Sequence, residues 1–185
     1  KGSPKFPIFN IYDVLLFFFN KTKKLDYLKP VELILKQLCS QGIYDHVEGG
    51  ISRYTIDENW LIPHFEKMLY DNAQFVFLLA KYLKVKKNEY FEKKILQTVD
   101  FLNKNFIDLE KKLLGSAFDA DSDGEEGKYY VFSYKELIKI KDIDQYFDIK
   151  PDGNWENKII LKEIKSPPET IILELKKLRK EKIKP

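Results

Sequence analysis

The chain has 185 residues, of which 44% are hydrophobic and 15% aromatic, enough to form the core of one ordinary domain. Its 32 basic and 29 acidic residues nearly cancel, and the net charge of +3 excludes the basic face expected of a nucleic-acid-binding protein. The single cysteine, Cys39, excludes an internal disulfide and a Cys-x-x-Cys redox or zinc site, which favours a reducing, cytoplasmic location.

Helical periodicity dominates the first two-thirds of the chain. The apolar run of residues 11–19 is shorter than the roughly 18–20 residues of a membrane span and carries Asp13, so it predicts a buried helix and no membrane partner. Pro30 fits the first turn of a second helix, whose apolar residues recur at spacings of three and four as far as Cys39, a predicted core side chain. Gly42 fits the left-handed position that ends a helix.

Three more helices follow in the pattern. One runs from about Pro63 to Leu83 and is apolar on several faces, as expected of a helix buried among neighbours. The next two span residues 89–106 and, after Pro167 and Pro168, residues 169–180.

Two stretches between these helices have no helical period. Residues 42–64 (GIYDHVEGGISRYTIDENWLIPH) contain Gly49 and Gly50, which permit a sharp reversal, and a possible short strand at 51–56. Residues 115–132 (GSAFDADSDGEEGKYYVF) predict two short strands joined by an acidic loop, and residues 158–161 predict one more strand. The dense polar and aromatic groups of residues 42–64 make this stretch the best candidate for a functional site.

Both histidines of the chain, His46 and His64, lie in the first irregular stretch. A neutral imidazole can take or give a proton at physiological pH, which suits acid–base catalysis. The alternative is that each histidine is structural and bonds a backbone carbonyl.

The motif PHFEKMLYDN is predicted to enter the helix that begins near Pro63. Helical spacing would put His64, Lys67 and Asp71 on one face, with Lys67 and Asp71 four residues apart and Glu66 and Tyr70 forming a neighbouring pair. The alternative is a solvated helix face with weak salt bridges.

The run from Asp119 to Gly124 imitates the start of a calcium-binding EF-hand loop. The match fails at the twelfth position, which is Tyr130 where a glutamate is required. We therefore expect no metal and no cofactor, and interpret the run as a turn that contributes an acidic side chain to a pocket.

Taken together, these motifs resemble the YyaL-type proteins, the spermatogenesis-associated, thioredoxin-domain-containing family. Residues 44–73 (YDHVEGGISRYTIDENWLIPHFEKMLYDNA) resemble the first signature of the family and residues 116–133 (SAFDADSDGEEGKYYVFS) the second, and SPKFP and GNWENKIIL also fit. The chain departs from the family where three glycines and an aromatic residue are expected, because it has Glu48, Gly49, Gly50 and Ile51 there.

The resemblance implies a thioredoxin-like domain, absent from this chain, followed by an (α/α)-toroid of the six-hairpin type similar to N-acylglucosamine and cellobiose 2-epimerases. Residues 1–185 would then be the first portion of that toroid, mainly α-helical with short β-hairpins in the loops. The opening KGSPKFP resembles neither a translation start nor a signal peptide, so we expect the remaining domains of a longer protein as partners. Because loops at one end of a toroid converge on its cavity, the two irregular stretches should meet in space.

The function that these patterns favour is a carbohydrate-active, epimerase- or isomerase-like pocket for a small carbohydrate-like substrate. Epimerisation beside a carbonyl needs a base and an acid, for which His46 and His64 are the available pair, with Asp45 or Glu66 orienting an imidazole. The residues expected to contact substrate are Arg53, Tyr54, Asp57, Trp60, Lys67, Tyr70, Asp71, Asn72, Asp119 and Asp121.

Two alternatives remain open from the sequence. One is glycoside hydrolysis by a carboxylate pair, for example Asp57 and Asp121. The other is a non-enzymatic toroid that binds a peptide or partner together with a thioredoxin-like domain.

Overall fold

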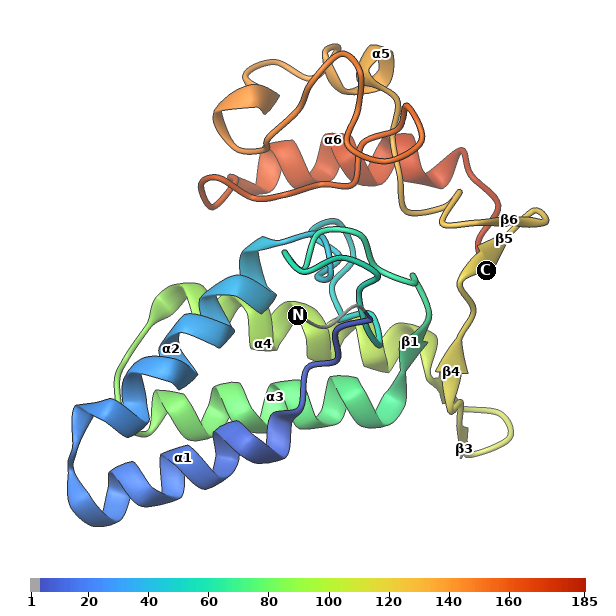
Figure 1. Cartoon of the computed structure of the whole chain (residues 1–185). Helices are drawn as coiled ribbons and strands as arrows, with labels where there is room; N and C mark the ends of the chain where they lie inside the picture. Colours follow the sequence, from blue (N-terminus) through green and yellow to red (C-terminus); the bar gives the residue numbers. More distant parts are fainter. Residues whose placement is uncertain (1–3) are drawn as a thin grey trace.

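The computed structural model describes residues 4–185, so the first three residues of the opening motif lie outside the described residues. The described chain is mainly helical (Figure 1). Its helices are α1 (Phe9–Thr22), α2 (Leu25–Ser40), α3 (Leu69–Leu83), α4 (Glu89–Asn105), α5 (Tyr134–Leu137), the 3-10 helix η1 (Ile143–Gln145) and α6 (Glu169–Lys180). Within this range no helix combines the length and apolarity needed to cross a bilayer.

Four helices form two neighbouring hairpins, α1–α2 and α3–α4, with α1 also packed on α3 (Figure 1). Their buried apolar side chains make the largest core, in which the rings of Phe9 and Phe75 lie 6.3 Å apart. The start of α4 is fixed by Asn88, whose side chain accepts a hydrogen bond from the Phe91 amide. Tyr44 and Trp60 of the irregular stretch also enter this core, which anchors that stretch at the ends of the hairpins.

The strands are two residues long and pair antiparallel. They are β1 (Lys67–Met68) with β4 (Ala117–Phe118), β2 (Ile107–Asp108) with β3 (Leu113–Leu114), and β5 (Asp121–Ser122) with β6 (Glu125–Glu126). The β5–β6 pair confirms a short hairpin in the second irregular stretch. The segments predicted as strands at 51–56 and 158–161 form isolated bridges instead, at Ile51, Thr55, Lys158 and Ile159.

The C-terminal segment forms a second layer, in which α6 lies over the irregular stretch of residues 42–64 (Figure 1). This layer has its own core, which includes Phe132, Phe147 and Leu175, and Val47 reaches into it from the first irregular stretch. A third cluster around Phe65 and Tyr130 fills the junction between the layers. The irregular stretch is therefore enclosed between two helical layers.

The predicted helices at 89–106 and 169–180 are confirmed by α4 and α6. The prediction for Pro30 was wrong, because α2 begins at Leu25 and places this proline inside the helix. Gly42 does not end α2 in a left-handed conformation, because the helix stops at Ser40 and the next residue is extended. A Cβ on Gly42 would lie 2.1 Å from the Leu61 carbonyl oxygen, so close packing of two backbones explains this glycine.

The helix predicted from Pro63 begins only at Leu69. Phe65 has a left-handed backbone, with φ of 57°, and Lys67 and Met68 are extended because they pair with β4. His64, Lys67 and Asp71 therefore do not share a helix face, and the predicted pair of Lys67 with Asp71 does not form.

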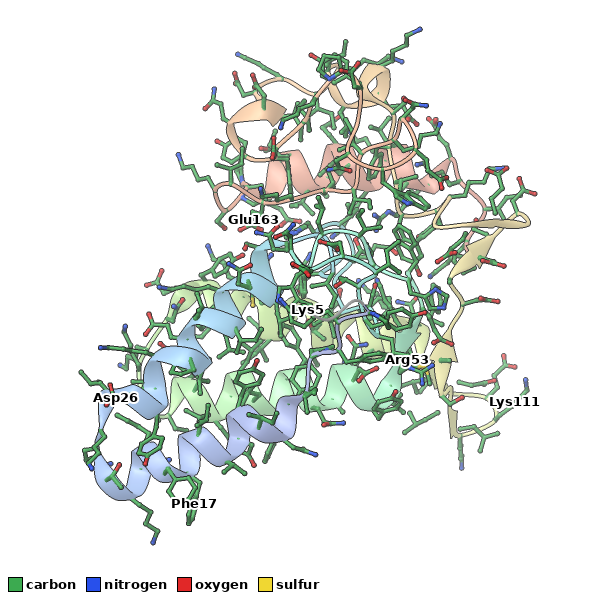
Figure 2. All side chains as sticks on the ribbon, viewed as in Figure 1. Lys5, Phe17, Asp26, Arg53, Lys111 and Glu163 are labelled. Carbon is green, nitrogen blue, oxygen red and sulfur yellow. The ribbon has the colours of Figure 1, made fainter. Side chains whose placement is uncertain are left out.

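Residues 11–19 are helical as predicted, but the prediction that this helix is buried was wrong for one side. Ile11, Val14 and Phe17 are each more than half exposed, and Figure 2 shows Phe17 pointing outward from α1. Only the side of α1 that faces α2 and α3 is covered within residues 4–185.

Candidate functional site

Asp57 builds the turn that shapes the first irregular stretch. Its carboxylate accepts hydrogen bonds from the backbone amides of Asn59 (2.7 Å), Leu61 (3.0 Å) and Ile62 (2.7 Å). This aspartate turn folds the chain back on itself. As a result, the Asp57 carboxylate is taken up by hydrogen bonds to nearby backbone amides.

The reversal aligns two short segments on either side of the turn. The Arg53 amide donates to the Glu66 carbonyl at 2.9 Å, and the His64 amide donates to the Tyr54 carbonyl at 3.1 Å. The side chains pair in the same register, because Arg53 Nη1 lies 3.2 Å from Glu66 Oε2 and the His64 ring stacks on Tyr54 with centroids 4.8 Å apart. Local backbone pairing thus brings four predicted site residues together.

His64 is oriented by a carboxylate from the second irregular stretch. Its Nδ1 lies 2.9 Å from Oε1 of Glu126 in β6, and the imidazole is about one-third exposed. A carboxylate on Nδ1 favours the tautomer that carries the proton there. The Nε2 atom then carries the lone pair, and no partner for it is found among residues 4–185.

Asp71, in the first turn of α3, is the buried acid beside this group. Its Oδ2 atom has no hydrogen-bond partner in the described structure, and neither has Nε of Arg53. Burial raises the pKa of the Asp71 carboxyl to about 6, although the Arg53 guanidinium and Tyr70 act in the opposite direction. Figure 2 places Arg53 beside β1, near the start of α3.

We call Arg53, Tyr54, His64, Glu66, Tyr70, Asp71 and Glu126 the outer polar cluster. Six of its seven members were predicted from the sequence as site residues, and Tyr70 is exposed. Glu126 also lines a cavity of about 820 Å³ between β5–β6 and the end of the described chain. The cluster therefore borders this cavity through Glu126.

Asp45 and Lys67 belong to a different, buried ion cluster with Arg179 of α6. Arg179 Nη1 contacts both carboxylate oxygens of Asp45, at 2.6 and 2.7 Å, and Lys67 Nζ lies 2.8 Å from Oδ2. Lys67 also donates to the Gly49 carbonyl at 2.8 Å. Burial raises the pKa of Asp45, but Arg179 and Lys67 outweigh it and the net pKa is lowered. Asp45 thus joins the two layers and does not orient an imidazole.

His46 lies in a second buried cluster with Glu163 and Lys94. Its Nε2 lies 3.1 Å from the Gln41 carbonyl oxygen, to which it donates, and its Nδ1 lies 3.1 Å from Glu163 Oε2 and 3.3 Å from Lys94 Nζ. Burial and the Lys94 charge lower the pKa of His46, although Glu163 opposes them. Both ring nitrogens are engaged and the side chain is 1% exposed, so the structure favours the structural alternative for His46.

The other predicted site residues lie apart from the outer polar cluster. Asn72 is fully buried, and its amide bonds the backbone of Ile51 and the Met68 carbonyl. Trp60 is buried under the Lys5 ammonium, 4.3 Å from the ring centroid. Asp119 and Asp121 are exposed, and Asp119 accepts the Asp121 amide in a local turn.

The two irregular stretches meet, as the sequence predicted. His64 contacts Glu126, and the Glu48 carboxylate accepts a hydrogen bond from the Tyr129 hydroxyl at 2.8 Å. The contacts between the two stretches are made by Glu126 and Tyr129. Asp119 and Asp121, which the sequence analysis selected from the second stretch, do not take part in these two contacts. No group of three or more His, Cys, Asp or Glu side chains in the described range is arranged to hold a metal ion.

The fold is mainly α-helical and corresponds to part of an (α/α)-toroid. A family 76 glycoside hydrolase from a bovine Bacteroides thetaiotaomicron strain matches 60% of this chain and 23% of its own, with a TM-score of 0.51 and 18% identity. No family model matches the chain.

Sequence comparison finds similar proteins over just over half of the chain. Spermatogenesis-associated protein 20 of Mus musculus and that of Homo sapiens are each 38% identical over 115 residues, which cover 57% of this chain. The chain is thus similar in sequence to spermatogenesis-associated protein 20, in agreement with the resemblance of its motifs. It spans 14% of the length of these curated relatives.

Proposed function

We propose that the outer polar cluster is the acid–base site of a carbohydrate-active toroid. The observation that carries the proposal is the His64–Glu126 pair, which leaves Nε2 of an accessible imidazole free to take a proton. Asp71 supplies the complementary acid, because its buried carboxyl has a pKa raised to about 6 and an oxygen without a partner. Two titratable groups with different environments are the usual basis of acid and base roles.

In the isomerase-like reaction, His64 removes the proton from the carbon beside a substrate carbonyl. The C–H electron pair moves into the carbon skeleton and the carbonyl oxygen gains the negative charge, which the Arg53 guanidinium stabilises. Protonated Asp71 returns a proton to the opposite face of the same carbon. The imidazolium and the carboxylate then exchange their protons with solvent before the next turnover.

Glycoside hydrolysis is the second candidate, favoured by the glycoside hydrolase neighbour. Asp71 would protonate the leaving oxygen, because a raised carboxyl pKa is what a general acid requires. Glu66 or Glu126 would activate the water, replacing the pair of Asp57 and Asp121 because the Asp57 carboxylate is held by backbone amides.

The test separates the two reactions. The protein is incubated in D₂O with glucose, mannose, fructose, N-acetylglucosamine and cellobiose, and proton NMR follows deuterium entry at the carbon beside the carbonyl. Aryl glycosides of the same sugars report hydrolysis by release of the aryl alcohol. Deuterium entry without glycoside cleavage supports the isomerase-like reaction, and the reverse supports hydrolysis.

His64→Ala should reduce whichever turnover is found by about 10²–10⁴-fold, the usual contribution of an acid–base group, with little change in melting temperature. Asp119→Asn, a change at an exposed carboxylate outside the cluster, is the matched control and should leave turnover unchanged. Turnover retained in His64→Ala would reject the acid–base role, and absence of both reactions would favour a binding module.

A further inference from the structure

The cavity beside the outer polar cluster has a composition that selects its ligand. It has a volume of about 820 Å³ and is bounded by β5–β6, the loop of residues 153–158 and the segment that follows α6. Figure 1 shows the chain end lying beside β5 and β6, and Glu181, Lys182 and Ile183 line this side of the cavity. The volume is in the range of small-molecule sites.

Trp155 forms an aromatic wall of this cavity, and its ring packs against that of Phe65. Its ring lies 5.2 Å from that of Phe65, which in turn stacks on Tyr130 at 5.5 Å. The loop that carries Trp155 is fixed by Asn154, whose amide bonds both the amide and the carbonyl of Ile160 at 2.8 Å. A fixed indole ring offers a negatively polarised face to the C–H groups of a sugar ring.

The charged groups of the cavity disfavour an anionic ligand. Six carboxylate side chains line it against three lysines. Lys128 is paired with Asp123 and Glu125, each at 2.8 Å, and Lys182 donates to the Val131 carbonyl. Carboxylates accept hydrogen bonds from hydroxyl groups but repel a phosphate.

We propose that this cavity binds an unphosphorylated saccharide, with one ring stacked on Trp155 and hydroxyl groups on the surrounding carboxylates. The inference rests on the proposed function, because Glu126 both lines the cavity and orients His64. It adds the class of substrate, a neutral sugar in place of a sugar phosphate, and the residue that positions its ring.

The chain contains two tryptophans, which makes a direct binding experiment possible. Glucose, mannose, N-acetylglucosamine and cellobiose, and the 6-phosphates of the first three, are titrated at millimolar concentration into ¹⁵N-labelled protein while the two indole N–H signals are followed by NMR. Trp155 should shift with at least one neutral sugar, whereas the buried Trp60 serves as an internal reference and stays constant. The matching 6-phosphate should bind at least tenfold more weakly.

Calorimetry on variants tests the Trp155 ring and the carboxylates of the cavity separately. Trp155→Ala should weaken binding of the neutral sugar at least tenfold, and Trp155→Phe, which keeps an aromatic face, should weaken it less. Glu181→Lys exchanges one carboxylate of the cavity for a cation and should strengthen binding of the sugar phosphate relative to the unchanged protein.

Equal or tighter binding of the 6-phosphates, an unchanged affinity in Trp155→Ala, or no Trp155 shift with any sugar would overturn the inference. His64→Ala separates it from the proposed function, because this variant should bind the sugar normally while losing turnover. Binding at Trp155 in a protein without turnover would keep the inference and reject the acid–base role. Turnover that is unchanged in Trp155→Ala would reject the inference and keep the acid–base role.

Discussion

At the scale of single residues, the effect of Asp71 on stability depends on its protonation state. Because burial raises its pKa to about 6, folding favours the protonated carboxyl. This contribution to stability is complete below the ordinary carboxyl pKa near 4 and is lost as the pH rises through about 6. At neutral pH the charged carboxylate keeps an oxygen without a partner in the described structure.

Asp71→Asn should therefore raise the free energy of unfolding at pH 7 by on the order of 1 kcal/mol, with a smaller effect at pH 4. Urea unfolding at the two pH values measures the difference, and Asp119→Asn at an exposed position should show none. A loss of stability at pH 7 would mean that the ionised carboxylate is well solvated.

The cluster of His46, Glu163 and Lys94 has the opposite pH dependence. Burial and Lys94 lower the pKa of His46, so its contribution to stability is present above about 6.5 and is lost as the pH falls. Burial raises the pKa of Glu163, but His46 and Lys94 outweigh it and lower this pKa to about 2, so its contribution is lost between about 4.5 and 2.

Glu163→Gln should cost about 3–5 kcal/mol at pH 7, because it leaves the buried Lys94 ammonium without its carboxylate at 2.8 Å. The control is Asp148→Asn, which breaks the partly exposed pair with Lys162 and should cost less than about 1 kcal/mol. Equal costs in chemical denaturation would show that Lys94 finds another partner or water. Figure 2 shows Glu163 between the helical hairpins and the C-terminal layer.

At the scale of elements, the β5–β6 hairpin provides two glycines with the same backbone but different surroundings. Gly124 and Gly127 have φ of 73° and 72°. A Cβ on Gly127 would lie 2.4 Å from the Phe65 ring, whereas a Cβ on Gly124 would meet nothing within 4 Å.

Gly124→Ala should cost about 1–2 kcal/mol for the left-handed backbone alone. Gly127→Ala should cost that amount plus about 1–3 kcal/mol, because the added methyl displaces a ring that is packed between Tyr130 and Trp155. Thermal unfolding of the two variants gives the difference directly. Equal effects would indicate that Phe65 moves freely.

The limits of a helix can be predicted from the sequence where the helical period of its own apolar and charged residues sets them. Residues 89–105 and 169–180 alternate apolar and charged positions with the helical period, and their limits are nearly those predicted. The start of α3 could not be predicted in this way. It is set by pairing of Lys67 and Met68 with residues about fifty positions later, which leaves no trace in local periodicity.

In the candidate site too, contacts that are local in sequence could be predicted and contacts between distant residues could not. Arg53, Tyr54, His64 and Glu66 come together through a local turn, so their grouping could be predicted from a short stretch of sequence. The partners that distinguish the two histidines lie 62 residues away for His64 and 117 for His46. Nothing near either histidine indicates that one is open and the other enclosed.

At the scale of the whole molecule, Arg179 is the main polar link between the layers. Arg179→Met would leave Asp45 with Lys67 and break the bond to the Tyr130 carbonyl, at a cost of about 3–5 kcal/mol. The helical hairpins have a core of their own, so the loss should be local.

Hydrogen exchange should therefore accelerate in α6 and in residues 44–52, while amides in the middle of α1–α4 keep their protection. Arg53→Met, which breaks a partly exposed pair, is the control and should leave α6 unchanged. Uniform acceleration throughout the chain would show that the layers unfold as one cooperative unit.

The distance along the chain between Asp45 and Arg179 also matters for biosynthesis. The two residues are 134 positions apart, so at a synthesis rate of roughly 5–20 residues per second the arginine follows the aspartate by on the order of 10 s. During that interval the two helical hairpins can fold on the ribosome around local contacts, while Asp45 has only a lysine as its counter-ion. The stretch that carries His64 is then covered last, and a nascent chain acquires its layered form only when α6 has emerged.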